Sequence, residues 1–441
     1  MGYFGTDGIR GKANEKLTPE LAYKVGRYLG YELVNGENNK FLIGRDTRLS
    51  GQMLEAALAS GLAASGCNVD LLGVVVTPLV SFVLENNDYV GGIMISASHN
   101  VYSDNGLKVM NDKGLKIDPF LQERIEDYLD GKIEIPYKVD AEIGVINDAH
   151  DLANTYVDYL KKKFTEDLSN YKIAVDTANG SASFLSKLYE DFSLDVTVIN
   201  NQPDGTNINN NCGSTHVEAL QAFMKDKEFD LGISFDGDGD RLMLVDSENN
   251  IIDGDGILYT VAQFYKKHDL LENDTVVVTV MSNLGLLKAL KASDIKVEVT
   301  DVGDKNVFKK MLDDKHIIGG EQSGHIILRE FSNMGDGFVV SLEILNIMAK
   351  EKKSLKELSE NLHILPQLLE NVVVKDTEKT LSDKEVKDKI EDVSKRLANS
   401  GRVLVRASGT EPLIRVMVEA ESKEICQECV NEIVEVVKEK L

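Results

Sequence analysis

An apolar run that ends in a polar or glycine-containing turn, followed by a helical stretch and a second apolar run, recurs three times along the chain. The first runs are Phe41–Gly44, Ile173–Val175 and Val276–Val280, and the second runs are Val69–Leu72, Val196–Ile199 and Val297–Val299. Strands that alternate with helices are typical of parallel α/β units. Recurrence at this scale predicts three related α/β domains, and ligands in such folds gather at the carboxyl ends of the strands.

The last part of the chain has a different pattern. After Pro366 we expect a β-α-β-β-α unit, with strand Val372–Lys375, helix Asp383–Ala398, strands Arg402–Arg406 and Leu413–Val418, and helix Lys423–Lys440. The charged, helix-like segment 350–361 is expected to lead into this unit as a hinge. The 441 residues are thus predicted to form an α/β protein of four domains, at residues 1–152, 153–250, 251–366 and 367–441.

Composition excludes several classes of protein. A formal net charge of −24 argues against binding to nucleic acid or to anionic membranes. No apolar run approaches the ~18 residues of a membrane span, and the N-terminus lacks the apolar region of a signal peptide. The four cysteines are too few for a disulfide framework, and the C-x-x-C of Cys426 and Cys429 falls within an amphipathic helical pattern. We therefore expect a cytoplasmic protein.

A short acidic loop follows the apolar run Leu231–Phe235. It reads D-G-D-G-D-R, so Asp236, Asp238 and Asp240 alternate with glycines and can converge on one point. Carboxylate oxygens are the ligands that Mg²⁺ and Ca²⁺ prefer. An acidic surface turn is the alternative, and a calcium EF-hand would need Glu where the chain has Ser247. The preceding strand and the adjacent Arg241 favour a Mg²⁺ site that handles phosphate.

Arginine is used sparingly, with 11 Arg against 38 Lys. Six of the arginines fall in loops rich in glycine or hydroxyl groups: Arg10, Arg45, Arg48, Arg241, Arg406 and Arg415. Because the guanidinium group is a planar, bidentate donor, this distribution indicates that phosphate is bound locally, against an unfavourable overall charge.

Two further loops carry functional groups inside the repeated units. Ser96-Ala97-Ser98-His99-Asn100 follows the apolar run Gly91–Ile95, with Lys108 shortly after it. A serine beside a histidine suggests nucleophilic catalysis, although an ordinary turn or helix cap fits the same letters. Near Mg²⁺, a serine hydroxyl could accept and return a phosphoryl group while Arg241 stabilises its charge. In Gly320–His325, Glu321 and Ser323 could bind adjacent hydroxyls of a sugar; a plain glycine-rich turn is the alternative.

A loop of the last domain, R-A-S-G-T-E-P at residues 406–412, joins two predicted strands, and Arg415 follows it. Two guanidinium groups, two hydroxyls and the N–H groups of a tight turn would form a phosphate cradle. A simple hairpin turn would not explain why two scarce arginines are placed there.

Four motifs in order, S-A-S-H-N, D-G-D-G-D-R, G-E-Q-S-G-H and R-x-S-G-T-E-P, resemble those of the α-D-phosphohexomutase superfamily. Three stretches, Phe4–Gly11, Pro203–Thr215 and Val280–Leu286, are similar to the phosphoglucosamine mutase family within it. The resemblance implies three α/β domains and a β-α-β-β-α domain around a central cleft. It also implies interconversion of glucosamine 6-phosphate and glucosamine 1-phosphate, on the route to UDP-N-acetylglucosamine. The protein could form a homodimer.

The resemblance also implies roles for individual residues. Ser98 would be the phosphoserine, and its phosphate would bind Mg²⁺ together with Asp236, Asp238 and Asp240. Glu321 and Ser323 match the sugar-binding loop. The loop for the non-reacting phosphate is matched by Arg406, Ser408, Gly409, Thr410 and Arg415. His99, Lys108 and Arg10 are candidates for proton transfer, and a sugar 1,6-bisphosphate would be the intermediate and the activator.

Two positions depart from the family pattern. Val101 stands where the family usually has proline, which frees one N–H and should loosen the turn after Ser98. Lys305 stands where arginine is common, and lysine cannot bind a phosphate bidentately. Two rival functions stay open at this point: a phosphomannomutase or phosphoglucomutase with the same machinery, and a catalytically silent phosphosugar-binding protein.

Overall fold

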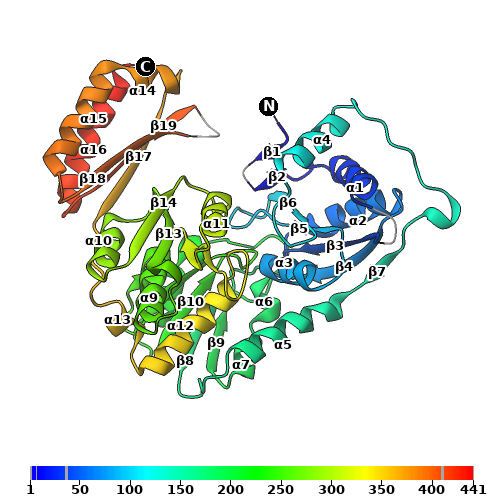
Figure 1. Cartoon of the computed structure of the whole chain (residues 1–441), viewed down its shortest axis with the longest axis horizontal. Helices are drawn as coiled ribbons and strands as arrows, with labels where there is room; N and C mark the ends of the chain where they lie inside the picture. Colours follow the sequence, from blue (N-terminus) through cyan, green and yellow to red (C-terminus); the bar gives the residue numbers. More distant parts are fainter. Residues whose placement is uncertain (1, 6, 35–37, 409–411, 441) are drawn as a thin grey trace. The chain divides into compact units, whose positions relative to one another are not determined.

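The computed structural model describes residues 2–5, 7–34, 38–408 and 412–440. The chain divides into two compact units, one of residues 1–280 and 296–359 and the other of residues 281–295 and 360–441. Figure 1 shows the course of the chain and the labels of its elements. The predicted α/β class is confirmed: the first unit holds three sheets with their helices, and the second holds a smaller sheet with helices.

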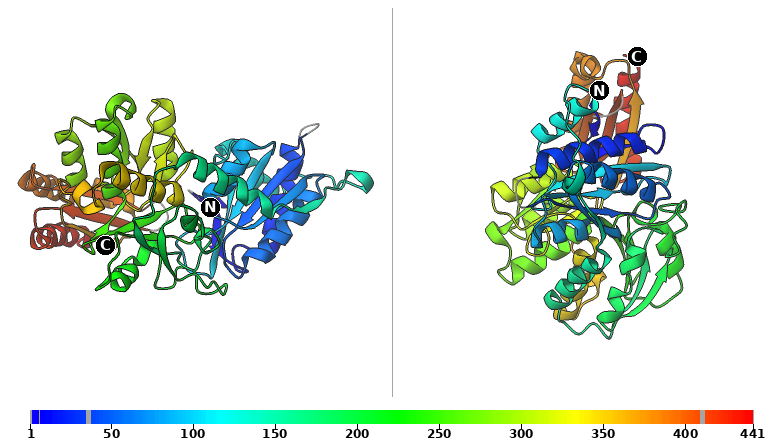
Figure 2. Two further views of the ribbon diagram at one scale, coloured as in Figure 1. Left: turned by 90° about the horizontal axis from the view of Figure 1, so that it is seen from below. Right: turned by 90° about the vertical axis from the view of Figure 1, so that its right-hand side faces the viewer.

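The first domain is built on a seven-stranded sheet in the order β1-β2-β6-β5-β3-β4-β7. Its strands are β1 (Phe4–Gly5), β2 (Gly8–Lys12), β3 (Lys40–Arg45), β4 (Asn68–Val74), β5 (Gly91–Ile95), β6 (Asp104–Asn111) and β7 (Ile146–Asp148). Its helices are α1 (Pro19–Leu33), α2 (Gly51–Ala63), α3 (Thr77–Asn86) and α4 (Pro119–Leu129). Helices α1 and α2 cover one face of the central strands and α3 covers the other (Figures 1 and 2).

The helix α1 follows directly from local sequence signals. Thr18 accepts a hydrogen bond from the N–H of Leu21 and Pro19 occupies the first turn, as expected for a capped helix start. Val25 and Leu29, four residues apart on one face of the helix, are fully buried and belong to the main core of this domain. The start and the buried face of this helix therefore follow from its own residues.

The second and third sheets are smaller. The second has the order β12-β11-β10-β8-β9 and the third β14-β13-β15-β16. The second comprises β8 (Lys172–Asp176), β9 (Asp195–Ile199), β10 (Leu231–Phe235), β11 (Leu242–Asp246), β12 (Ile251–Ile252), α5 (Ala153–Lys163), α6 (Ala182–Leu185), α7 (Leu188–Asp191) and α8 (Glu218–Met224). The third comprises β13 (Thr275–Thr279), β14 (Lys296–Thr300), β15 (Ile318–Gly320), β16 (Ile326–Leu328), α9 (Gly254–Lys267), α11 (Asp304–Asp313), α12 (Gly337–Glu351) and α13 (Leu355–Leu358).

The three sheets are mixed rather than wholly parallel. In each domain a parallel strand is followed by an antiparallel partner: β5 by β6, β10 by β11, and β15 by β16. The three loops with functional groups are the connections of these hairpins. Sequence reasoning missed the return strands, because each begins within or close to a polar motif that masks its apolar alternation. The functional loops therefore begin at the carboxyl ends of central strands, as predicted.

The second unit contains a three-stranded sheet in the order β17-β19-β18, built from β17 (Gln367–Val373), β18 (Arg402–Ala407) and β19 (Leu413–Glu419). Its helices are α10 (Leu284–Ala292), α14 (Thr377–Ser382), α15 (Lys384–Leu397) and α16 (Lys423–Lys438). Apolar residues of its strands, α15 and α16 form one core that includes Val393, Ile414 and Ile433. Cys426 and Cys429 belong to this core, so the helix-face interpretation of the C-x-x-C fits their burial.

One predicted strand has other bounds in the structure, and the predicted helix-like segment before this unit is divided. The strand expected at 372–375 begins earlier, as β17, because it pairs along the whole length of β19. The segment 350–361 is not one helix. Helix α12 ends at Glu351, Lys352 adopts a left-handed conformation (φ 53°), and Ser354 and Glu357 form a capping box around the single turn α13.

Candidate active site

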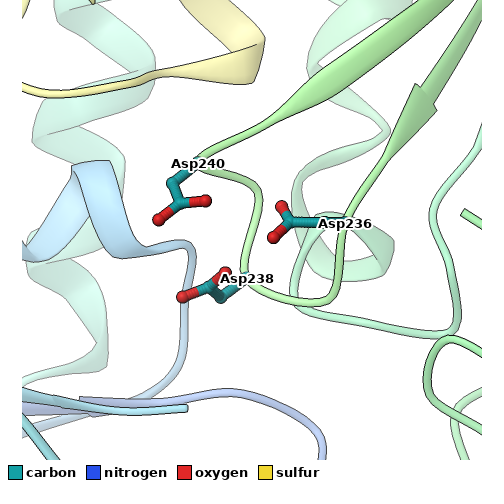
Figure 3. Close-up of side chains that lie close together, drawn as sticks. All are labelled: Asp236, Asp238 and Asp240. Atoms are coloured by element: carbon teal, nitrogen blue, oxygen red, sulfur yellow. The ribbon is translucent and has the colours of Figure 1, made fainter. Parts of the chain in front are cut away.

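The serine loop after β5 and the acidic loop after β10 meet inside the first unit. Ser98 is almost fully buried and its hydroxyl donates to Asp236 Oδ2 at 2.6 Å. The carboxylates of Asp236, Asp238 and Asp240 are buried, and oxygen atoms of all three lie within 4.8 Å of one another. Figure 3 shows the three side chains converging from one loop. The predicted convergence of this triad, and its proximity to Ser98, are features of the structure.

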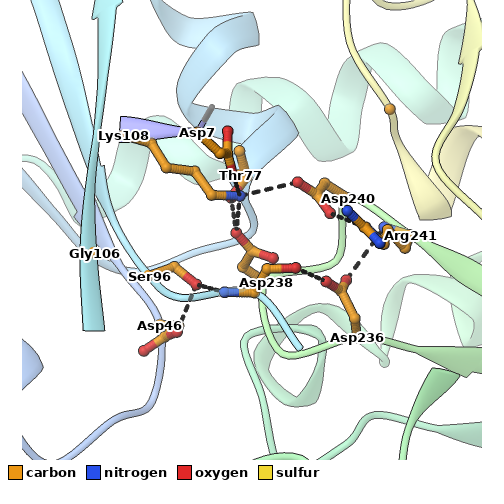
Figure 4. A network of polar contacts seen from close by, with 12 residues as sticks. Asp7, Asp46, Thr77, Ser96, Gly106, Lys108, Asp236, Asp238, Asp240 and Arg241 are labelled. Carbon is orange, nitrogen blue, oxygen red and sulfur yellow. Dashed lines mark hydrogen bonds and ion pairs between the residues drawn. The ribbon is translucent and has the colours of Figure 1, made fainter. Parts of the chain in front are cut away.

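The free oxygens of the triad fit a divalent cation. Lys108 on β6 donates to Asp238 Oδ2 at 2.6 Å and to Asp240 Oδ2 at 3.0 Å, and Thr77 also donates to Asp238 Oδ2 (Figure 4). The Oδ1 atoms of Asp238 and Asp240 are buried and have no hydrogen-bond partner among the described residues. Buried carboxylate oxygens without a donor are costly unless a cation binds them.

The electrostatics of the cluster lead to the same conclusion. Burial, with repulsion from Asp240 and Asp238, raises the pKa of Asp236 well above its ordinary value. Burial also disfavours ionised Asp240, but Lys108 outweighs it and holds the pKa of that carboxyl well below the usual range. Lys108, which also faces Asp7, therefore does not by itself neutralise the three buried carboxylates, and a hard divalent cation suits this donor set.

The three candidates for proton transfer differ in protonation. The Nδ1 atom of His99 lies 3.3 Å from Ser98 Oγ, and burial, with the guanidinium groups of Arg241 and Arg10, lowers the pKa of His99 to about 4. Burial would lower the pKa of Lys108, but Asp238, Asp240 and Asp7 raise it well above its ordinary value. Arg10 forms an ion pair with Asp7. At neutral pH His99 is thus an uncharged imidazole, whereas Lys108 and Arg10 are paired cations.

The arginines of the predicted phosphate set have different environments. Arg241 is half-buried, with Nε 3.8 Å from Asp240 Oδ1, close enough to act on a group bound at the triad. Arg45 instead pairs with Glu55 at 3.1 Å, and Arg48 is 1% exposed and donates to backbone carbonyls. Arg45 and Arg48 were therefore wrongly interpreted as phosphate ligands. Their loop has the same composition as a phosphate loop, and only the fold shows where it points.

The loop after β15 contributes a residue that sequence reasoning passed over. Glu321 is buried and accepts a hydrogen bond from the N–H of Gly303 at 3.0 Å, while Ser323 is half-buried. His325, the last letter of the same motif, is buried with Nδ1 3.9 Å from Asp240 Oδ1. The N–H of Gly335 donates to His325 Nε2 at 3.1 Å, so a neutral ring carries its proton on Nδ1, which faces Asp240.

A chain of ion pairs links the first and third domains and was also missed. Lys116 lies 2.7 Å from Asp7 Oδ1 and 2.7 Å from Asp304 Oδ2, and Asp7 lies 3.6 Å from Lys108. These four residues are among those that line a cavity of about 330 Å³, together with Lys305, His325 and Asp240. Lysine and aspartate are common surface residues, so spacing alone gave no signal that these would meet.

The predicted phosphate loop belongs to the second unit. Arg406 of β18 and Arg415 of β19 are directly opposite one another in the antiparallel pair. Arg415 Nε is buried without a hydrogen-bond partner in the described part of the chain, and the N–H of Ser408 donates to Leu413 O at 2.8 Å. Gly409 and Thr410 lie outside the described residues. Two guanidinium groups side by side at one end of a hairpin suit an anion with several oxygens.

Among the described residues, no helix combines the length and apolar character needed to cross a lipid bilayer. Cys67, Cys212, Cys426 and Cys429 are free and buried.

Comparison with known domain families gives four matches in order along the chain. They are phosphoglucomutase/phosphomannomutase alpha/beta/alpha domain I at residues 1–135, domain II at 154–249, domain III at 253–364, and the C-terminal domain at 369–436. The solved structure of a phosphoglucomutase/phosphomannomutase family protein from Burkholderia thailandensis is 23% identical, with a TM-score of 0.82, over 99% of this chain and 97% of that chain. The fold is therefore the same as in this family.

Proteins with higher sequence identity to this chain show which of these enzyme families it belongs to. The phosphoglucosamine mutase of Bacillus subtilis is 47% identical over 100% of this chain and 99% of its own length. That of Halalkalibacterium halodurans is also 47% identical, over the same shares. A more distant protein, an N-acetylphosphoglucosamine mutase of Aspergillus fumigatus solved with GlcNAc-6P and magnesium, shares the fold: it is 19% identical with a TM-score of 0.71, over 100% of this chain and 96% of that chain. With its four domain matches and its full-length identity, the chain belongs to the phosphoglucosamine mutase family of the phosphoglucomutase/phosphomannomutase enzymes.

Proposed function

We propose that this protein interconverts glucosamine 6-phosphate and glucosamine 1-phosphate, using Ser98 as the carrier of the phosphoryl group. The observation that carries the proposal is the 2.6 Å hydrogen bond from Ser98 Oγ to Asp236 in a buried acidic triad. Full-length identity of 45–47% to curated phosphoglucosamine mutases supports the choice of substrate. The product would be a precursor of UDP-N-acetylglucosamine, which implies a cytoplasmic enzyme.

Asp236, Asp238 and Asp240 would hold Mg²⁺ together with a phosphate oxygen on Ser98. When bound, the cation would supply charge neutralisation for the phosphoryl oxygens and so lower the barrier to transfer. The unpartnered Oδ1 atoms of Asp238 and Asp240 support this assignment. Arg241, on the same loop, would add a second positive charge to the transferring group.

In the first half of the reaction, the bond between Ser98 Oγ and phosphorus breaks and a bond forms between phosphorus and the free hydroxyl oxygen of the sugar phosphate. The proton of that hydroxyl ends on Ser98 Oγ. His99 suits this proton movement best, because its imidazole is neutral at pH 7 and its Nδ1 lies 3.3 Å from Ser98 Oγ. Lys108 and Arg10 would remain protonated and orient the acceptor.

The second half reverses these steps at the other end of the sugar 1,6-bisphosphate, after the intermediate has turned around. Glu321 and Ser323 would bind sugar hydroxyls. Arg406, Ser408, Gly409, Thr410 and Arg415 would bind whichever phosphate is not reacting. A division into domains 1–152, 153–250, 251–366 and 367–441 would give each of these loops its own domain. Free bisphosphate would also phosphorylate Ser98 in an enzyme that has lost its phosphate, and so act as an activator.

Phosphorus NMR of the purified protein with Mg²⁺ and a trace of bisphosphate tests the substrate. Glucosamine 6-phosphate should be converted fastest when it, glucose 6-phosphate and mannose 6-phosphate are offered separately. A clear preference for glucose or mannose would keep the mechanism but assign the protein to the rival mutases. No conversion of any sugar by protein with phosphorylated Ser98, as verified from the mass of the Ser98 peptide, would favour a silent binding protein.

The Ser98→Ala variant tests the mechanism. Isomerisation should be abolished, because the group that receives the phosphoryl is gone, whereas titration calorimetry should still detect binding of glucosamine 6-phosphate. Turnover close to that of the natural protein would remove Ser98 from the reaction.

A further inference from the structure

Four backbone carbonyls of the serine loop converge on one buried arginine. Arg48 donates from Nη2 to Ser98 O at 2.9 Å and to Asn100 O at 2.8 Å, and from Nη1 to Asp104 O at 3.0 Å and to Val101 O. Its remaining donor, Nε, pairs with Asp46 Oδ2 at 2.8 Å. A guanidinium with five donors in a fixed plane defines the position of every group that it binds.

A second side chain, from the second domain, binds two of the same carbonyls. Asn209 Nδ2 donates to Ser98 O at 2.9 Å and to Asn100 O at 3.0 Å, and Asn209 is 4% exposed. The acidic loop closes the arrangement, since a Cβ on Gly237 would lie 2.6 Å from Ser98 O and 2.8 Å from Asn209 Nδ2. Glycine at 237 is thus required by the close approach of these two loops.

The conformation held by these contacts is unfavourable by itself. Ser98 has a φ of 52°, in the left-handed region that residues other than glycine, asparagine and aspartate rarely adopt. Its N–H donates to Ser96 Oγ at 2.9 Å, and Ser96 donates to Asp46, the partner of Arg48. Strained conformations of this kind persist only where the surroundings impose them.

We propose that Arg48 and Asn209 form a clamp that holds Ser98 in its left-handed conformation, so that Oγ points at the acidic triad. They are positioning residues, since neither touches the triad through its side chain in the described contacts. The inference rests on the proposed function in taking Ser98 as the phosphoryl carrier. It also assigns a task to the stretch 203–215, one of the three that are similar to the phosphoglucosamine mutase family: through Asn209 this stretch acts on the reactive serine.

Two pairs of variants test the clamp. Asn209→Asp replaces two donors with acceptors that face carbonyl oxygens, and Asn211→Asp makes the same change at an exposed position of the same loop. Arg48→Lys removes the planar donor, and Arg45→Lys is its control. Asn209→Asp and Arg48→Lys should lower both kcat and the rate of Ser98 phosphorylation by bisphosphate by roughly 100-fold, with KM nearly unchanged. Both controls should match the natural protein.

Equal kinetics for Asn209→Asp and Asn211→Asp, in a preparation whose natural form isomerises the sugar, would overturn the clamp but not the proposed function. Failure of the natural protein to isomerise the sugar would overturn the proposed function alone. The clamp can still be tested in that case, because a second measurement, of thermal stability, needs no activity. Ser98→Gly should melt at a higher temperature than Ser98→Ala, since glycine relieves the strain. This difference should shrink when Asn209→Ala is added. An unchanged difference would show that Asn209 does not impose the conformation.

Discussion

At the scale of single residues, the site is governed by how buried charges are paired. Lys108 donates to the Oδ2 atoms of Asp238 and Asp240, and their Oδ1 atoms, which have no hydrogen-bond partner among the described residues, can bind a cation. His99 stays neutral beside Ser98 because it is buried near two guanidinium groups. The same physics acts away from the site on Glu343 of α12, which is 3% exposed and accepts from Asn346 Nδ2 at 2.9 Å.

Glu343 should make the protein less stable as the pH rises. Burial raises the pKa of Glu343 from 4.5 to about 7, so the unfolded chain loses this proton first. Its contribution to stability is fully present below pH 4.5 and is lost as the pH rises to about 7. Glu343→Gln should therefore raise the free energy of unfolding at pH 8 by up to roughly 3 kcal/mol, and by much less at pH 5.

Urea denaturation at pH 5 and pH 8 measures this change in the free energy of unfolding. Glu123→Gln, at an exposed position on α4, is the control. An equal effect of Glu343→Gln at both pH values would show that Glu343 does not titrate between them.

At the scale of elements, each functional loop of the first unit is the turn of a hairpin whose first strand is central and parallel. The rigid strand fixes where the loop begins, and the return strand carries further residues into the site, as β6 carries Lys108.

The packing of helix α1 against helix α2 depends on glycine at two positions. A Cβ on Gly61 of α2 would collide with the carbonyl oxygen of Tyr23 in α1, and one on Gly26 of α1 with that of Leu58 in α2.

Gly61→Ala should destabilise the protein despite alanine's higher helix propensity. Propensity alone would stabilise by about 1 kcal/mol, but forcing apart closely packed helices costs about 1–3 kcal/mol. Ala56→Gly, at an exposed position of the same helix, should also destabilise, by about 1 kcal/mol. Chemical denaturation of the two variants checks this; a more stable Gly61→Ala would mean that the helices can separate without cost.

At the scale of the whole molecule, the chain divides into two units with their own cores, and the acidic triad belongs to one of them. Calorimetry should therefore resolve two transitions. At a concentration one hundred times its dissociation constant, Mg²⁺ should raise the free energy of unfolding of the first unit by about 2.7 kcal/mol, and the transition temperature of that unit should rise with it. The transition of the second unit should not change. Chelation should abolish turnover, and added Mg²⁺ should restore it.

In Asp238→Asn the Mg²⁺-dependent shift should be lost. A shift of both transitions, or one that survives this substitution, would place the cation elsewhere.

The sequence alone determined the class of fold, the three repeated units and the four motifs, because these depend on local periodicity, turn residues and short spacings. It also indicated the convergence of Asp236, Asp238 and Asp240, which are close along the chain. Tertiary structure alone decided which of the scarce arginines face the site, since Arg45 and Arg48 have the same local pattern as a phosphate loop. It also brought Asp7, Lys116, Asp304 and His325 together across domains. The proximity of these residues depends on how separate elements pack, and a short stretch of sequence cannot predict that packing.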